Sequence, residues 1–310
     1  MEEIDVPSIE PPTRVAPPPE GDPEPAAPNE VEVEARRVPW WGGVLALVVG
    51  GISAQLVGAI PVVIGAVVWM AQHPSDAPPD TDRMMQDITR SFWVLGPSIV
   101  MTGGTMILAA LATARLARVP MRQALGLRGA PWPAFLAAPV GILALGPTSD
   151  ALRRLMQEYL PWATLGALEG LDEIARSVPV WIAVPAMALV PGFAEETLFR
   201  GVFQRSIRNG VLAVLLSGGL FACYHMDPQH VVAVLPLGFY LAWLAQRTQS
   251  LAVPVTGHVF NNAAAVLGSV YFAEEAASQE ALDWWWAPIG WVVCAGCVAL
   301  VWWTTRRREG

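Results

Sequence analysis

Long apolar runs separated by short polar segments dominate the chain from residue 40 onward. A helix needs about 20 mostly apolar residues to cross about 30 Å of hydrocarbon. We predict eight membrane-spanning helices, over residues 40–70, 92–116, 132–145, 178–203, 212–224, 231–245, 251–272 and 285–303. Pro61 predicts a kink or tilt in the first of them. The expected fold class is therefore all-α, a polytopic membrane helix bundle.

The residues that precede the first apolar run have the opposite pattern. Residues 1–38 repeat Pro, Glu, Asp and Ala and contain almost no side chains that could form a core, so we predict a disordered cytoplasmic tail. The expected domains are this tail, a transmembrane helical domain over residues 39–305, and a basic C-terminal tail over residues 306–310.

Composition supports a membrane protein and excludes other classes. Hydrophobic residues make up 54% of the chain and charged residues 15%, and the mean hydropathy is +0.42. The net charge of −8 arises largely from the tail, because ten of the 27 acidic residues lie within residues 1–34. No basic patch with interleaved aromatic residues suggests nucleic acid as a partner. Cys223, Cys294 and Cys297 all lie in apolar segments, so a disulfide framework is not expected.

Arginines near the ends of the predicted spans give an orientation. Two precede the first span, and the others on the same side lie in alternate links and after the last span: Arg36, Arg37, Arg115, Arg118, Arg122, Arg128, Arg205, Arg208, Arg247, Arg306, Arg307 and Arg308. The side that carries them should face the cytoplasm. We therefore expect an integral protein of the bacterial inner (plasma) membrane, surrounded by lipid, with both termini in the cytoplasm.

Three charged residues interrupt one apolar run, which reads VPGFAEETLFR. A charge at membrane depth costs roughly 2.5 to 3.5 kcal/mol, so Glu195, Glu196 and Arg200 are candidates for function. On a helix Glu196 and Arg200 lie four residues apart and can pair, which leaves Glu195 without that partner. The alternative is that both glutamates lie at a helix end near the headgroups and bind Arg205 or Arg208.

Two other predicted spans also carry polar side chains at a four-residue spacing. His225 follows Phe221 in FACYH, and Asn262 follows His258 in GHVFNN. One chemical interpretation is a hydrolytic site, in which Glu195 takes a proton from water and imidazole and amide donors stabilise the oxyanion. A second is that Glu195, His225 and His258 ligate a catalytic zinc ion, although no H-E-x-x-H helix supports this locally.

The three motifs together resemble a known family. EETLFR, FACYH and HVFNN are similar to the EExxxR, FxxxH and HxxxN motifs of the CAAX protease and bacteriocin-processing enzyme family. That family comprises intramembrane proteases and includes the type II CAAX prenyl endopeptidases. The resemblance covers about residues 178–267, which would form the catalytic core.

The resemblance implies roles for the motif residues. Glu195 would activate water, His225 would help to hold it, and His258 with Asn262 would form the oxyanion site. Glu196, Arg200 and Phe221 would support this machinery. Members have been described both as metalloproteases and as glutamate-dependent enzymes, so a zinc cofactor stays open.

The expected substrate is a membrane-presented peptide, either prenylated or carrying a leader, in which one peptide bond is hydrolysed. Two other classes of function compete with this expectation. A non-catalytic scaffold or transport subunit would bind a partner peptide in the same cavity. A proton-coupled carrier would use the buried Glu and His side chains, although neither an inverted repeat nor paired broken helices support it.

Overall fold

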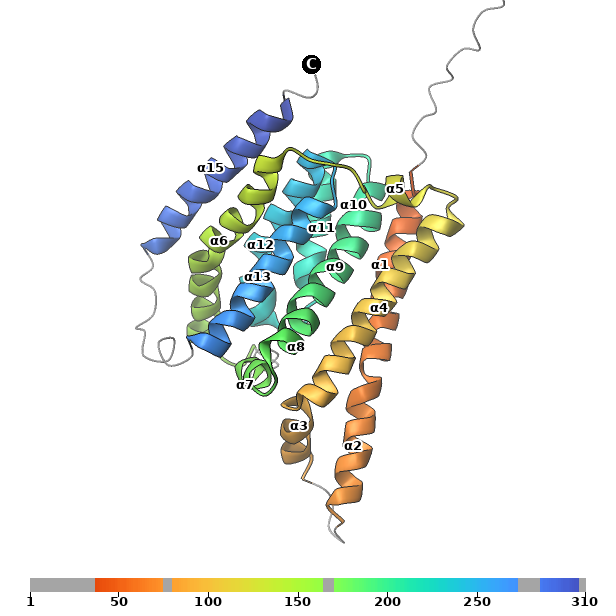
Figure 1. The fold of residues 1–310 in the computed structure, drawn as a ribbon, viewed down its shortest axis with the longest axis vertical. Coiled ribbons are helices and arrows are strands. Elements are labelled where there is room, and N and C mark those ends of the chain that lie inside the picture. The colour runs from red at the N-terminus through yellow and green to blue at the C-terminus, as the bar shows by residue number, and fades with distance from the viewer. Residues whose placement is uncertain (1–36, 75–79, 164–169, 273–284, 307–310) are drawn as a thin grey trace, which may run out of the picture. The chain divides into compact units, whose positions relative to one another are not determined.

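The structure is a computed structural model that describes residues 37–74, 80–163, 170–272 and 285–306. The predicted N-terminal tail up to residue 36 and the last four residues of the predicted C-terminal tail lie outside these ranges. Within them, every regular element is a helix (Figure 1). The predicted all-α membrane bundle is confirmed.

Among the described residues, six helical segments are long and apolar enough to cross a membrane. They are Trp40–Gln72, Phe92–Leu116, Trp132–Tyr159, Val180–Ser206, Pro228–Thr248 and Trp286–Arg306. Two further helices match predicted spans without belonging to this set: Gly210–Cys223 is shorter, and Ala252–Tyr271 has 20 residues. All eight predicted segments are thus helical, and the count of eight spans is approximate.

The helices carry the following labels in chain order. They are α1 (Trp40–Gly58), α2 (Ile60–Gln72), α3 (Thr81–Thr89), α4 (Phe92–Leu116), α5 (Met121–Ala124), α6 (Trp132–Tyr159), α7 (Leu171–Arg176), α8 (Val180–Val184), η1 (Pro185–Leu189), α9 (Val190–Glu196), η2 (Thr197–Phe203), α10 (Gln204–Ser206), α11 (Gly210–Cys223), α12 (Pro228–Thr248), α13 (Ala252–Tyr271) and α15 (Trp286–Arg306). The run from α8 to α10 forms one span, in which η1 and η2 are π-helical.

The third predicted span is longer in the structure than in the prediction. The third span was predicted to end at residue 145, but α6 continues to Tyr159. Its later charges are paired, since Asp150 accepts from Arg153 at 2.8 Å and from Arg154 at 2.7 Å, which lowers the cost of extending the helix. The polar stretch after residue 145 therefore begins inside α6.

The first span breaks where Pro61 predicts a break, because α1 ends at Gly58 and α2 begins at Ile60. The fifth span is short: α11 has 14 residues, or about 21 Å of helix, which is less than the thickness of the hydrocarbon layer. His225 follows α11 directly, in the turn before α12.

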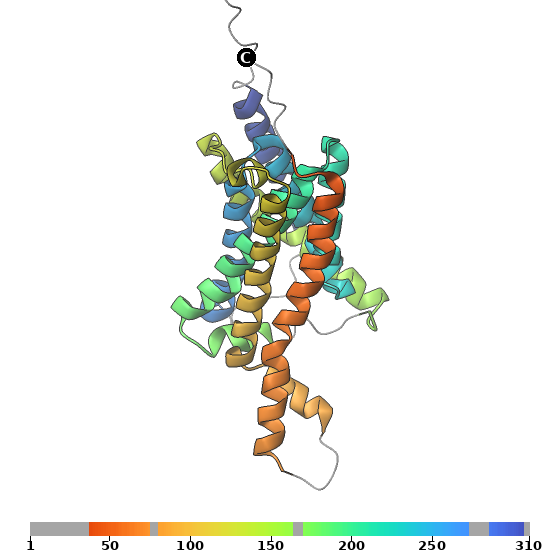
Figure 2. The ribbon, with the colours of Figure 1, turned by 90° about the vertical axis from the view of Figure 1, so that its right-hand side faces the viewer.

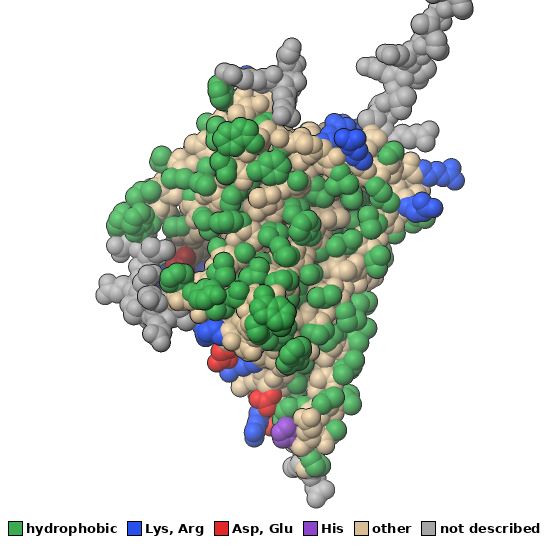
Figure 3. Space-filling view, in the orientation of Figure 1, with side chains coloured by type: hydrophobic (Ala, Val, Ile, Leu, Met, Phe, Trp, Pro, Cys, Tyr) green, Lys and Arg blue, Asp and Glu red, His purple; other side chains and the backbone are tan. Residues whose placement is uncertain are grey.

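The helices pack so that the run from α8 to α10 lies in the interior. α9 and η2 contact α4 on one side, and η1 and α9 contact α13 on the other. α1 packs on α4, while α6 packs on α12, α13 and α15 (Figures 1 and 2). The outer face shown in Figure 3 is covered by hydrophobic side chains, with charged groups toward its two ends. This distribution is that of an integral membrane protein.

Candidate active site

α9 carries both glutamates and approaches α13 closely because of a glycine. A Cβ atom on Gly192 would lie 2.5 Å from Cγ2 of Val259 and 3.1 Å from its backbone nitrogen, so no larger residue fits without a shift. The π-helical segments η1 and η2 flank α9 on both sides. Such segments are frequent at functional sites because they alter the direction in which side chains point.

Glu196 and Arg200 form the ion pair that their spacing predicts. Nη1 of Arg200 donates to Oε1 of Glu196 at 2.9 Å, and both side chains are fully buried. Nη2 of Arg200 donates to the carbonyl oxygen of Gly238 at 3.0 Å, which ties α12 to this pair. Two buried opposite charges with further hydrogen bonds are tolerated at a depth where either charge alone would be costly.

His258 joins this pair from α13. Its Nδ1 lies 2.9 Å from Oε1 of Glu196, which is an acceptor, so Nδ1 carries the hydrogen. Nε2 then faces the other glutamate, with 3.9 Å between it and Oε2 of Glu195. Oε2 of Glu195 is buried and accepts no hydrogen bond from the described residues, although 17% of the Glu195 side chain is exposed. The imidazole of His258 therefore lies between the carboxylate of Glu196 and that of Glu195.

The ring of Phe221 connects the remaining members of the site. The guanidinium carbon of Arg200 lies 4.2 Å from the ring centroid, a cation–π contact. The rings of His258 and His225 lie edge-on to Phe221, at centroid distances of 5.5 and 5.2 Å. Phe221 thus contacts both histidines and the guanidinium of Arg200.

His225 and Asn262 are placed less directly. Nδ1 of His225 lies 3.1 Å from the carbonyl oxygen of Phe221, and its ring lies 4.3 Å from that of His230. Asn262 follows His258 by one turn of α13, and its Oδ1 accepts from Asn261 at 3.2 Å. Among the described residues, Glu195 has no hydrogen bond or ion pair with His225 or Asn262. His258 therefore lies beside both glutamates, and His225 is linked to it through contacts with Phe221. Among the described residues, Asn262 has no hydrogen bond to any of these groups.

The zinc alternative requires three side chains that can bind one metal ion together. Within the part of the chain that the structure describes, no three His, Cys, Asp or Glu side chains are placed to hold a metal ion. Glu195, His225 and His258 are thus not a ligand set in this structure, and each of the two imidazoles contacts the ring of Phe221.

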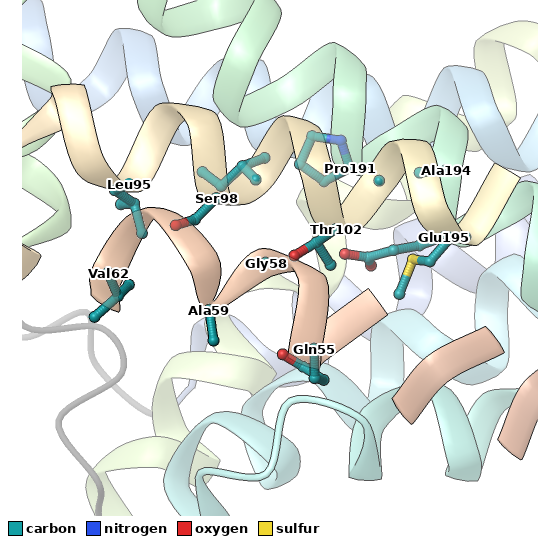
Figure 4. Close-up of a pocket in the computed structure, with 13 residues that line it drawn as sticks. Gln55, Gly58, Ala59, Val62, Leu95, Ser98, Thr102, Pro191, Ala194 and Glu195 are labelled. Carbon is teal, nitrogen blue, oxygen red and sulfur yellow. The ribbon is translucent and has the colours of Figure 1, made fainter. Parts of the chain in front are cut away.

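Glu195 also lines a cavity of about 360 Å³. The other lining residues come from α1, α2, α4 and α9 and from the residue between α1 and α2: Gln55, Gly58, Ala59, Val62, Leu95, Ser98, Ile99, Thr102, Gly103, Met106, Pro191 and Ala194. Figure 4 shows the Glu195 carboxylate directed toward Thr102, with Gln55 across the cavity from them. The cavity is largely apolar and presents a few polar groups near Glu195, as a peptide site requires.

Gln55 and Thr102 were not among the candidates from the sequence. The Thr102 hydroxyl lies 3.4 Å from the carbonyl oxygen of Ala54, and the Tyr224 hydroxyl contacts the side chain of Gln55. One signal was present, because Gln55 carries the only amide side chain in the first predicted span. A polar side chain in so apolar a segment is a candidate for function on its own.

The fold and the site define a class of protein. It is an integral membrane helix bundle with a buried network of Glu, Arg and His side chains beside a cavity. Residues 177–264 match the family model described as "Type II CAAX prenyl endopeptidase Rce1-like". A protein of Bacillus subtilis (strain 168) described as "Putative membrane peptidase YdiL" is 29% identical over 102 residues. That alignment covers 32% of this chain and 41% of the relative. No solved structure matches the chain. The two matches support assignment of the chain to the CAAX protease and bacteriocin-processing enzyme family, as the motifs predicted.

Proposed function

We propose that the protein is an intramembrane endopeptidase in which Glu195 activates the attacking water. One observation carries the proposal: Oε2 of Glu195 lies 3.9 Å from Nε2 of a histidine that Glu196 orients, and Glu195 lines the cavity. A separation of 3.9 Å is too long for a hydrogen bond between the two groups. One water molecule that is hydrogen-bonded to both groups requires the Glu195 carboxylate to turn toward the cavity, because Oε2 is buried in this structure.

The first step is the addition of this water to the peptide carbonyl. Glu195 takes one proton as the oxygen of the water forms a bond to the carbonyl carbon, and the carbonyl oxygen becomes an oxyanion. His258 fixes the water through Nε2, because the bond from Nδ1 to Glu196 holds the ring in one orientation. Arg200 balances the charge of Glu196 throughout the step.

The second step is the collapse of the tetrahedral intermediate. The carbon–nitrogen bond breaks, and the proton held by Glu195 passes to the departing amine, which restores the carboxylate. Donors near the oxyanion stabilise it before collapse. The resemblance assigns this role to His258 and Asn262 and the holding of the water to His225. Because Nδ1 of His258 is bonded to Glu196 and its Nε2 holds the water, the donors that remain for the oxyanion are the amide groups of Asn262 and of Gln55, which lines the cavity.

The substrate that fits this site is a peptide held in the membrane. The cavity lies between the broken helix pair α1 and α2, the helix α4 and the helix α9, and most of its lining is apolar. The family match favours a prenylated peptide, and a peptide with a leader segment is the second candidate. Both termini of the enzyme would lie in the cytoplasm of a bacterial cell, because the Arg-rich segments lie on that side.

The test compares purified wild-type protein with Glu195→Gln, using lipid-anchored fluorogenic peptides, one bearing a farnesylated cysteine and one a leader sequence. Gln keeps the size of the side chain but cannot accept the proton, so we expect kcat to fall by about 10³-fold. Glu158→Gln, which changes an exposed carboxylate at the end of α6, is the matched control and should keep full turnover.

Two results would contradict this function. If Glu195→Gln retained turnover, another group would be the base. If both peptides bound to the wild type but gave no product in a long incubation, the scaffold alternative would replace the enzyme. A chelator arm, with 1,10-phenanthroline followed by added zinc, separates the mechanisms, because the proposed chemistry predicts unchanged turnover in both conditions.

A further inference from the structure

Three arginines from distant parts of the chain come together at one end of the bundle. Arg37 precedes α1, Arg128 follows α5, and Arg205 lies in α10. α10 packs on α1, with Ser206 against Gly43 in the first turn of α1, and the guanidinium of Arg205 lies against Gly126, two residues before Arg128. None of the three has an ion pair with a carboxylate among the described residues. Like charges held together in this way repel one another unless an anion lies between them.

The guanidinium of Arg205 is held in place by the backbone. Gly126 has a φ of +68°, and a Cβ atom there would lie 2.5 Å from Nη1 of Arg205 and 2.7 Å from its Cζ. The guanidinium therefore packs against a position that only glycine fills without strain. Nε donates to the carbonyl oxygen of Gln123 and Nη1 to that of Gln249, each at 3.4 Å. These bonds are long, so the donors retain capacity for a better acceptor.

The loop that carries Arg128 is also fixed. Its Gly126 carbonyl oxygen accepts from the backbone nitrogen of Leu251 at 3.0 Å. The hydroxyl of Ser250 donates to the carbonyl oxygen of Arg128 at 2.7 Å. The loop after α5 is thus attached to the turn between α12 and α13, and the position of Arg128 relative to Arg205 is set by the fold.

We propose that Arg37, Arg128 and Arg205 form a binding site for the phosphate group of an anionic phospholipid. Guanidinium groups bind phosphate oxygens through paired, charge-assisted hydrogen bonds, and three of them match the several oxygens of one phosphate. The site lies at the end of the bundle where Figure 1 places the start of α1, α5 and α10. This is where the helices leave the hydrocarbon and meet lipid headgroups, so a lipid is the ligand at hand.

The proposal is independent of the proteolytic activity and is tested by binding. The full-length protein in a neutral detergent is titrated with phosphatidylglycerol, with phosphatidylcholine and with inorganic phosphate, and bound lipid is counted by native mass spectrometry. We expect phosphatidylglycerol to bind and phosphatidylcholine to bind at least tenfold more weakly. Both lipids carry the phosphodiester, but the quaternary ammonium of choline is repelled by the three guanidinium groups, and about 1.4 kcal/mol of repulsion is a factor of ten.

A matched pair of variants isolates the site from general charge. Arg37→Gln with Arg128→Gln should weaken phosphatidylglycerol binding about tenfold. Arg115→Gln with Arg118→Gln removes the same charge from exposed positions nearby and should change it less than twofold. Both double variants avoid the partly buried Arg205, and equal melting temperatures without lipid would show that they fold alike.

Three results would overturn the lipid site. Equal losses in the two double variants would show general electrostatic attraction only. Binding of inorganic phosphate as tight as that of phosphatidylglycerol would assign the site to a soluble anion. Binding of neither by the wild type would leave the three arginines to a partner of another kind.

Discussion

At the scale of single residues, the site depends on Glu196 as a shared acceptor. One oxygen of Glu196 accepts from both Arg200 and His258, so the same carboxylate orients the histidine and compensates the buried guanidinium. Glu195, its neighbour in sequence, points into the cavity instead (Figure 4). Adjacent positions on a helix differ in direction by about 100°, which explains why two neighbouring glutamates take different roles.

Removing one member of the buried ion pair should be worse than removing both charges. We expect Arg200→Met to destabilise the protein by about 3 to 5 kcal/mol, because it leaves the charge of Glu196 buried without its partner. Glu196→Gln in the Arg200→Met background should recover part of that loss. Thermal unfolding in detergent of the two single variants and the double variant measures this coupling. A double variant that is as unstable as the sum of the singles would contradict it.

The sequence predicted part of this residue network. A spacing of four on one helix is enough to predict the pair of Glu196 and Arg200. The bond from His258 to Glu196 joins residues 62 apart in sequence, and no local spacing specifies it. The motif resemblance brought His258 into the site, but which glutamate it binds depends on the rotation of α13 against α9.

At the scale of elements, close helix crossings place the catalytic groups. Gly192 lets α9 approach α13, and on the other side a Cβ atom on Gly103 of α4 would lie 2.6 Å from Cγ1 of Val190. Small residues at such crossings are the usual means by which membrane helices pack. The distance between Glu195 and His258 therefore depends on atoms that take no part in the chemistry.

A single methyl group at the crossing of α9 and α13 should disturb the site. We expect Gly192→Ala to lower turnover more than tenfold, because its Cβ atom displaces α13 and separates Glu195 from His258. Adding Val259→Ala removes the nearest atom and should restore part of the turnover. Gly268→Ala, on α13 where a Cβ atom meets nothing within 4 Å, is the matched control. Assay of kcat and of melting temperature for these variants decides, and no rescue by Val259→Ala would refute the steric account.

Hydrophobic pattern predicted which elements exist but not where all of them end. Pro61 marks a real break, whereas Pro147 lies inside α6 without ending it. The difference is that α6 continues into a segment whose charges pair within the helix. The short length of α11 was visible in the sequence, but the position of His225 in the turn between two helices follows only from where α12 begins.

At the scale of the whole molecular domain from Arg37 onward, the direction of the helices alternates so that the Arg-rich links share one end. α5, α10 and the start of α1 lie at that end, and α3 lies at the other (Figures 1 and 2). The Arg pattern in the sequence predicted this grouping. Which of the two ends faces the cytoplasm is a separate prediction, made from the arginines.

Cysteine labelling on the two sides determines this orientation. The background replaces Cys223, Cys294 and Cys297 with Ala, and single cysteines are then introduced as Gly129→Cys at the Arg-rich end or Asp82→Cys in α3. A charged maleimide cannot cross the membrane, so in intact spheroplasts it should label Asp82→Cys, and Gly129→Cys only after permeabilisation. The physical reason is that arginines near short links resist translocation, so the end with more of them stays inside. The opposite labelling pattern would place the three-arginine site outside the cell and the acidic α3 in the cytoplasm, against that rule.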